Sequence, residues 1–157
     1  MFDIVIIAVG KIKEKFYRDG FNEYIKRLSP YARIKIEELK SEPFKNETEK
    51  NKSKEAEGER ILNCLANYQD VTVFVLDEHG QELTSIDLAS TLSRNQNSKL
   101  VFVLGGTVGL SNKILRNSKI TKLSLSQMTL PHELARVVLA EQLYRGICIS
   151  RGKDYHY

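Results

Sequence analysis

The chain has 157 residues, of which 41% are hydrophobic and 28% charged, and this is typical of one soluble globular domain spanning residues 1–157. No apolar run approaches the roughly 20 residues that cross a bilayer, and no basic segment precedes the apolar N-terminus, so we expect neither a membrane segment nor a signal peptide. The net charge of +4 is uneven, with −3 in residues 1–93 and +7 in residues 94–157, and this favours a polyanionic partner such as nucleic acid.

The first half of the chain predicts two strands and two helices. Residues 3–10 form an apolar run closed by glycine, which is typical of a buried strand. Apolar residues then recur at helical spacing over 11–28, and a proline follows. Residues 33–39 alternate as in a strand, 41–47 read as a polar loop, and a charged helix is expected to reach Leu65.

The second half continues this alternation, which favours an α/β fold with a mainly parallel sheet flanked by helices. The β-branched run at 71–76 predicts a strand buried on both faces. Thr84 or Ser85 is expected to cap the helix that follows. A proline is expected at the first position of the last, long helix. The predicted elements are strands at 71–76, 100–104 and 122–125 and helices at 84–95, 111–118 and 131–150.

Three loops that follow predicted strands have the composition of a ligand site. They cover residues 77–80, 105–109 and 126–129. Ligands of open α/β sheets bind at the carboxyl ends of strands, so we expect these loops to converge on one crevice. Glycines at 105 and 106 predict that something passes close to the backbone there.

Several kinds of chemistry lack their residues. No lysine follows Gly109 as a P-loop requires, the Rossmann glycine spacing is absent, and there is no nucleophile elbow. Cys64 and Cys148 form no metal or redox spacing, so we expect two reduced thiols, no metal and a cytoplasmic protein. What remains is a slot with small and apolar walls, which suits a flat heterocycle such as adenine.

Four motifs together resemble the RlmH family of SPOUT-class methyltransferases. They are AVGKIKEKF at 8–16, VFVLGGTVGL at 101–110, LSLSQMTLPHELARVVLAEQLYRG at 123–146 and RGKDYHY at 151–157. The similarity covers essentially the whole chain in the same motif order. One departure is Tyr157, which stands where the family often ends in a basic residue, so a terminal phosphate contact is expected to be missing.

The resemblance implies an α/β trefoil knot, a homodimer and S-adenosylmethionine as methyl donor. It also implies a target, N3 of a pseudouridine in helix 69 of 23S rRNA, methylated on the assembled 70S ribosome. The glycines would then make room for the donor. The implied donor-binding residues are Leu76, Gly105, Gly106, Leu125, Ser126, Gln127, Met128, Thr129 and Leu130.

The C-terminal tail carries the catalytic residues that the resemblance implies. The N3 proton must leave through a base or through stabilisation of the anion. Tyr155 is expected to stack on the base or bond its edge, His156 to take the proton or contact a phosphate, and Arg151 to hold a phosphate or stabilise the anion. The broad apolar face of the 131–150 helix predicts a self-complementary interface, across which one subunit's tail completes the other's donor site.

Three further residues are candidates for RNA contacts, namely His132, Arg136 and Arg145. The two arginines have an alternative, because they lie three and four positions from Glu133 and Glu141 and can pair with them. Two other functions also stay open. One is a SPOUT methyltransferase that acts on transfer RNA, and the other is a ribosome-associated factor that has lost the chemistry.

Overall fold

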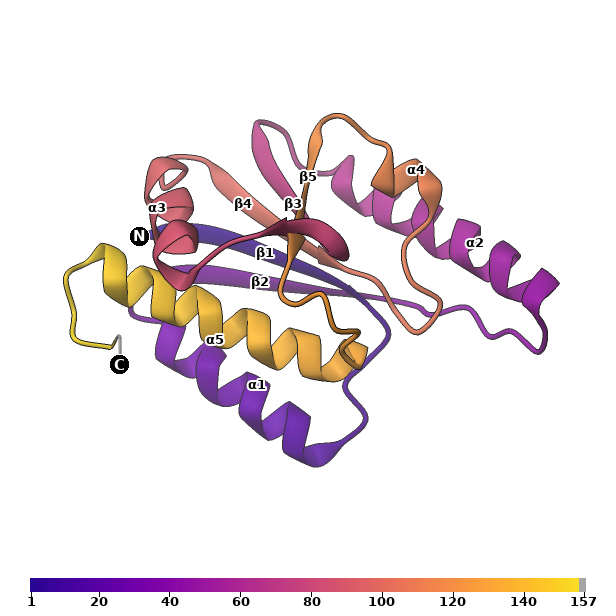
Figure 1. The fold of residues 1–157 in the computed structure, drawn as a ribbon, viewed down its shortest axis with the longest axis horizontal. Coiled ribbons are helices and arrows are strands. Elements are labelled where there is room, and N and C mark those ends of the chain that lie inside the picture. Colours follow the sequence, from indigo (N-terminus) through magenta and orange to yellow (C-terminus); the bar gives the residue numbers. More distant parts are fainter. Residues whose placement is uncertain (156–157) are drawn as a thin grey trace.

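The computed structural model describes residues 1–155, in which strands and helices alternate along most of the chain (Figure 1). The boundaries agree with most of the predicted segments. The elements are β1 (Phe2–Val9), α1 (Lys15–Leu28), β2 (Ala32–Leu39), α2 (Glu47–Leu65), β3 (Val71–Glu82), α3 (Ser85–Arg94), β4 (Lys99–Leu104), α4 (Asn112–Leu115), β5 (Ile120–Ser124) and α5 (His132–Ser150).

The five strands form one sheet in the order β2-β1-β4-β3-β5, and all four pairings are parallel. This confirms the predicted α/β class. Parallel strands are covered by helices on both faces, which explains why β1 is continuously apolar from Ile4 to Val9 rather than alternating. Trefoil knotting of the chain stays a prediction.

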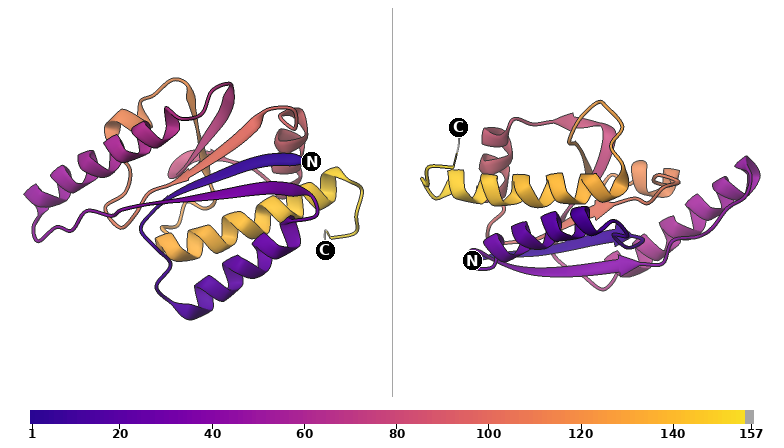
Figure 2. Two further views of the ribbon diagram at one scale, coloured as in Figure 1. Left: turned by 180° about the vertical axis from the view of Figure 1, so that it is seen from behind. Right: turned by 90° about the horizontal axis from the view of Figure 1, so that it is seen from below.

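Two cores lie on the two faces of the sheet. Ile4 and Ile6 of β1 point to the face covered by α1, α3 and α5, whereas Val5 and Ile7 point to the face covered by α2 and α4. Helix α5 lies between α1 and α3 (Figures 1 and 2). Helix α2 projects away from the sheet at its N-terminal end (Figure 1).

Local signals in the sequence set several helix ends. Thr84 caps α3 through a capping box, in which its side chain accepts from the Asp87 N–H and the Asp87 carboxylate accepts from the Thr84 N–H. The side chain of Asn46 caps α2 by accepting from the Glu49 N–H at 2.9 Å. Pro131 takes the N-cap position of α5, so the prediction that it is the first helical residue was wrong by one position.

The largest difference from the predicted elements lies in β3. The sequence predicts a strand that ends at Leu76 and a loop at 77–80, whereas the strand continues to Glu82. Its pairing with β5 jumps from Leu76 to Gln81, so residues 77–80 bulge out of the ladder. Within residues 1–155, no helix combines the length and apolar character needed to cross a membrane.

Candidate active site

A cavity of about 710 Å³ opens at the carboxyl ends of β4 and β5 and at the bulge within β3. This size lies in the usual range for small-molecule sites. The three loops expected to converge there do so, which confirms that prediction. The lining residues are Leu76, Asp77, Glu78, His79, Leu104, Gly105, Gly106, Thr107, Gly109, Leu110, Leu115, Leu125, Ser126, Met128, Thr129, Leu130, Pro131, His132 and Ala135.

Hydrogen bonds tie the bulge in β3 to the loop that follows β5. Ser124 Oγ donates to the main-chain oxygen of Glu78 at 3.2 Å. Thr129 Oγ1 donates to the Glu78 carboxylate at 2.6 Å. The two walls of the cavity are therefore joined to each other as well as to the sheet.

Eight of the nine expected donor-binding residues line this cavity, and Gln127 does not. The Gln127 side-chain amide instead donates to the Glu82 carboxylate at 3.2 Å. Met128 lines the cavity while 77% exposed, so it lies at the mouth. The sequence reasoning missed the lining residues Leu104, Leu110, Leu115 and Ala135, whose apolar side chains carry no signal that separates a cavity wall from the core.

The structure gives a different reason for the glycines from the one expected. A Cβ atom added at Gly106 would lie 3.0 Å from Val9 Cγ1 and 3.5 Å from a carboxylate oxygen of Glu57. One added at Gly105 would lie 3.1 Å from Leu110 Cγ. Both glycines line the cavity, but what leaves no room at Gly106 is protein packing beneath it.

Glu57, on α2, is buried under this loop and only partly satisfied. Its Oε1 accepts from the Glu42 N–H at 2.9 Å, whereas within residues 1–155 its Oε2 has no hydrogen-bond partner. Burial raises the pKa of the Glu57 carboxyl. A Cβ atom added at Gly106 would therefore stand in van der Waals contact with an oxygen that has no hydrogen-bond partner within residues 1–155.

Gly106→Ala should lower the free energy of unfolding by about 1–3 kcal/mol, because the added Cβ atom overpacks the site against Val9. Urea denaturation measures this loss. Thr107→Ala is the matched control, since Thr107 is exposed on the same loop and its truncation should change stability by about 0.5 kcal/mol or less. Equal stability of the two variants would contradict the packing role.

His132 begins α5 and lines the cavity. Burial, the positive charge of Arg136 and, more weakly, that of Lys13 lower the pKa of its imidazole, despite the opposing effect of Glu133. The imidazole is therefore neutral at pH 7. Asp77 and Glu78 place two carboxylates in the facing wall, so the cavity combines apolar, acidic and neutral polar groups.

Arg136 does not belong to an RNA surface, contrary to the expectation. Its side chain is 2% exposed. The guanidinium donates to the main-chain oxygens of Val9 and Gly10 at 2.9 and 2.7 Å and to the Glu38 carboxylate at 3.1 Å. Its partner is Glu38 rather than Glu133, so the proposed pairing along the helix was also wrong.

Arg145 forms the expected pair with Glu141, with 2.6 Å between Nη2 and Oε1. Its Nη1 also donates to the main-chain oxygen of Tyr155 at 3.1 Å, and its guanidinium lies 4.9 Å from the Tyr155 ring. Tyr155 packs edge-on against Tyr144, with 4.8 Å between ring centroids. Arg145 therefore holds the tail, while its RNA role stays a prediction.

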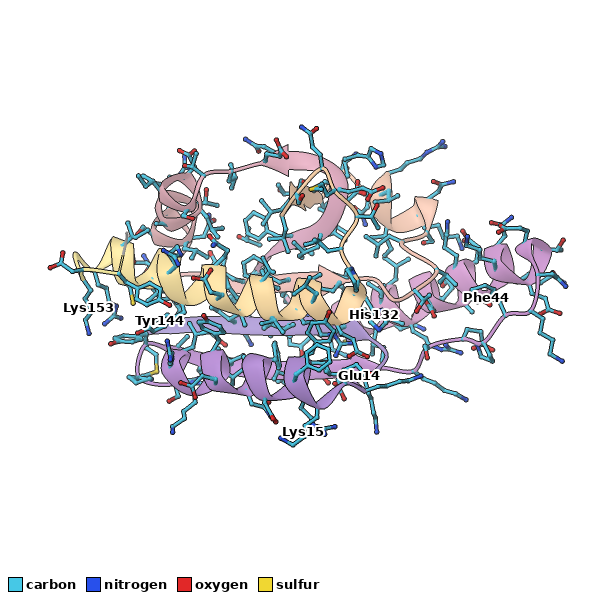
Figure 3. All side chains as sticks on the ribbon, turned by 60° about the horizontal axis from the view of Figure 1, so that its bottom comes forward. Glu14, Lys15, Phe44, His132, Tyr144 and Lys153 are labelled. Carbon is cyan, nitrogen blue, oxygen red and sulfur yellow. The ribbon has the colours of Figure 1, made fainter. Side chains whose placement is uncertain are left out.

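Two of the three expected catalytic residues, Arg151 and Tyr155, lie beyond the C-terminal end of α5, far from the cavity of their own chain. Arg151 follows the last residue of α5, and its guanidinium lies 5.3 Å from the ring of Tyr31. Figure 3 shows His132 at the start of α5 and Lys153 beyond its other end. The 19-residue helix between them is about 28 Å long. His156, the third expected catalytic residue, and Tyr157 lie outside the described residues.

Comparison with known proteins decides the family. The family model described as "Predicted SPOUT methyltransferase" matches residues 2–156. The chain belongs to the SPOUT methyltransferases. Within this family it is similar to two curated proteins named ribosomal RNA large subunit methyltransferase H, one from Kosmotoga olearia and one from Bacillus thuringiensis. It is 44% identical to the first over 99% of both chains, and 42% identical to the second over 98% of this chain and 99% of the other. The RlmH resemblance is thereby confirmed.

A solved structure of a probable methylase family protein from Haemophilus influenzae has the same fold. It aligns with 99% of this chain and 71% of its own, with a TM-score of 0.57 and 12% sequence identity. In this SPOUT methyltransferase, no three His, Cys, Asp or Glu side chains of residues 1–155 gather in a way that could hold a metal ion.

Proposed function

We propose that this SPOUT methyltransferase transfers a methyl group from S-adenosylmethionine to N3 of a pseudouridine in helix 69 of 23S rRNA on the assembled ribosome in the cytoplasm. The observation that carries the proposal is the single cavity formed by the three predicted loops, in a chain similar over its whole length to rRNA large subunit methyltransferases. The surplus of positive charge in residues 94–157 suits an RNA substrate.

The cavity residues fit S-adenosylmethionine. Leucines from all three segments provide apolar walls for an adenine ring, and main-chain groups near Gly105 and Gly106 would bond its edge. Asp77 and Glu78 provide negative charge that complements a sulfonium ion. The donor, when bound, supplies a methyl group already activated by the positive sulfur.

Because the methyl group arrives activated, the protein's remaining tasks are to align the acceptor nitrogen and to manage its proton. Tyr155 would stack on the target base or bond its edge. Arg151 would stabilise the nitrogen anion or hold a neighbouring phosphate, and His156 would accept the proton. The neutral imidazole of His132 adds no positive charge beside the sulfonium.

We further propose a homodimer in which the tail of one chain completes the cavity of the other. About 28 Å of helix separates the cavity from the tail of the same chain, so a rearrangement within one chain would have to cross that length. Leu134, Val138 and Ile149 of α5 are partly exposed apolar residues, which suits a helix that packs against a second copy. Leu143, on the same helix, does not belong to this interface, because it is fully buried within its own chain.

A methylation assay with labelled S-adenosylmethionine tests the function. Intact ribosomes, separate subunits and transfer RNA are offered in parallel, and the product RNA is mapped by mass spectrometry. We expect one methyl group in helix 69 of 23S rRNA. Methylation of transfer RNA alone would favour the other SPOUT activity, and calorimetry that shows no donor binding with or without ribosomes would favour a non-catalytic factor.

The affinity for S-adenosylmethionine should fall at acid pH because of His132. Its pKa lies below the usual 6.5, so the imidazole stays neutral at pH 7 and gains its charge only as the pH falls below that value. A charge near the sulfonium should weaken binding by about 1 kcal/mol, or roughly fivefold in Kd. Calorimetric titration between pH 8 and pH 5 measures the effect.

Two controls identify the source of this pH dependence. His132→Gln removes the titrating group and should flatten the curve. S-adenosylhomocysteine has no positive sulfur, so its affinity should change less over the same range. If the His132→Gln variant keeps the wild-type curve, another group is responsible.

A further inference from the structure

Four exposed residues around the start of α1 remain unexplained by the donor site or the tail. They are Lys11, Lys13, Lys15 and Phe16, from the turn after β1 and the first residues of α1, and we call them the lysine–phenylalanine edge. Phe16 is 64% exposed, which makes it the most exposed of the six phenylalanines. Glu14 and Lys15 lie at the start of α1 near His132 (Figure 3).

This edge is fixed to the cavity by buried charged residues. The Glu133 carboxylate accepts from the N–H groups of Lys13 and Glu14 at 2.9 and 3.1 Å. Arg136 binds the carbonyls of Val9 and Gly10, just before the edge. Glu133 directly follows His132, which lines the cavity, so both anchors stand on the first turns of α5. Backbone bonds of this kind hold the segment in place while its side chains point outward.

Phe16 rests on a supporting ring. The Phe16 and Tyr17 centroids are 4.2 Å apart, and Tyr17 packs against the core beneath α1. The exposed Phe16 ring is thereby in tilted contact, at 49°, with a ring that is anchored in the core. Exposed aromatic rings supported in this way are the platforms on which proteins stack unpaired RNA bases.

The charge beside Phe16 suits RNA phosphates. Lys15 forms an ion pair with Asp19 on the next helical turn. Lys11 and Lys13 are exposed and, within residues 1–155, form no ion pair. Two unpaired lysines and one exposed aromatic ring therefore lie on the segment that Glu133 ties to the start of α5.

We propose that the lysine–phenylalanine edge binds an unpaired nucleotide of the RNA next to the methylated base. The base stacks on Phe16, and Lys11 and Lys13 contact the flanking phosphates. This inference rests on the proposed function and adds the surface that receives the substrate. The proposed occupant of this edge is RNA. The experiment below would detect a second copy of the chain or a ribosomal protein there instead.

The experiment measures steady-state methylation of intact ribosomes by wild type, Phe16→Ala, Phe16→Leu and Phe16→Trp. Loss of stacking in Phe16→Ala should raise KM for ribosomes about tenfold at unchanged kcat. Phe16→Trp should keep the wild-type KM, and Phe16→Leu should behave like Phe16→Ala because it lacks a ring face. Phe44→Ala is the matched control, since Phe44 is also exposed but lies on the loop before α2 (Figure 3).

The lysines are tested through salt dependence. Replacing both Lys11 and Lys13 by glutamine should reduce the slope of log affinity for ribosomes against log salt by about 1.4, as expected for two lost phosphate contacts to single-stranded RNA. Affinity for S-adenosylmethionine and the sedimentation coefficient of the protein should not change in any of these variants.

Three results would overturn the inference. The first is a wild-type KM in Phe16→Ala. The second is a wild-type KM in Phe16→Leu, because it would indicate an apolar contact with protein, and the third is a shift of Phe16→Ala towards monomer, because it would indicate that a second copy covers the edge. A wild-type enzyme that leaves ribosomes unmethylated contradicts the proposed function itself, and the inference with it. The two failures are therefore distinguishable.

Discussion

Mixed dimers should regain activity when one chain lacks the tail and the other lacks a working donor cavity. The first chain ends before Asp154, and the second carries Leu130→Trp, which places a large ring in the cavity wall. If each active site combines the cavity of one chain with the tail of the other, one of the two sites in the mixed dimer is intact. Its activity on ribosomes should then be about half that of wild type.

The matching homodimers serve as controls, and both should be inactive. The truncated homodimer should still bind S-adenosylmethionine, because its cavity is built from loops at 76–80, 104–110 and 125–132. The Leu130→Trp homodimer should be folded and should have lost donor binding, which calorimetry checks beforehand. An inactive mixed dimer would show that cavity and tail act within one chain. Full activity of the truncated homodimer would remove the tail from the chemistry.

The sequence predicted the parallel sheet and most of its elements because the signals there are local. Continuous apolar runs mark β1 and β4, and the Thr84 capping box marks the start of α3. The carboxyl-end rule for parallel sheets then brought three separate loops together correctly. The bulge at 77–80 was missed, because it depends on how β3 pairs with β5 and not on the residues of β3 alone.

The roles of single residues were harder to predict where their partners are distant in the chain. Arg136 was expected on a helix surface near Glu133, but its three acceptors come from β1, the turn after it and β2, between 98 and 127 positions away. Gly106 was correctly placed at the cavity, but no sequence rule says that its missing side chain faces Val9 and Glu57. In both cases tertiary packing decides the role.

Replacement of Arg136 by methionine should destabilise the protein strongly. The substitution keeps an unbranched side chain of similar reach and removes every N–H donor. The carbonyls of Val9 and Gly10 would lose the bonds that Arg136 makes, at about 1–3 kcal/mol for each buried acceptor left unsatisfied. The lost ion pair with Glu38 adds little to this destabilisation, because Glu38 is partly exposed and water can solvate its carboxylate. We expect the free energy of unfolding to fall by about 3 kcal/mol or more, measured by urea denaturation at one fixed protein concentration.

Arg145→Met is the matched control, since it makes the same change on the same helix. Arg145 pairs with Glu141 at a partly exposed position, where removal of an ion pair should lower stability by about 1 kcal/mol or less. If Arg136 served RNA instead, Arg136→Met would keep the wild-type urea midpoint and weaken ribosome binding. The structural role predicts instead that Arg136→Met lowers the urea midpoint. The lysine–phenylalanine edge then loses its anchor, because the carbonyls that Arg136 holds lie directly before Lys11.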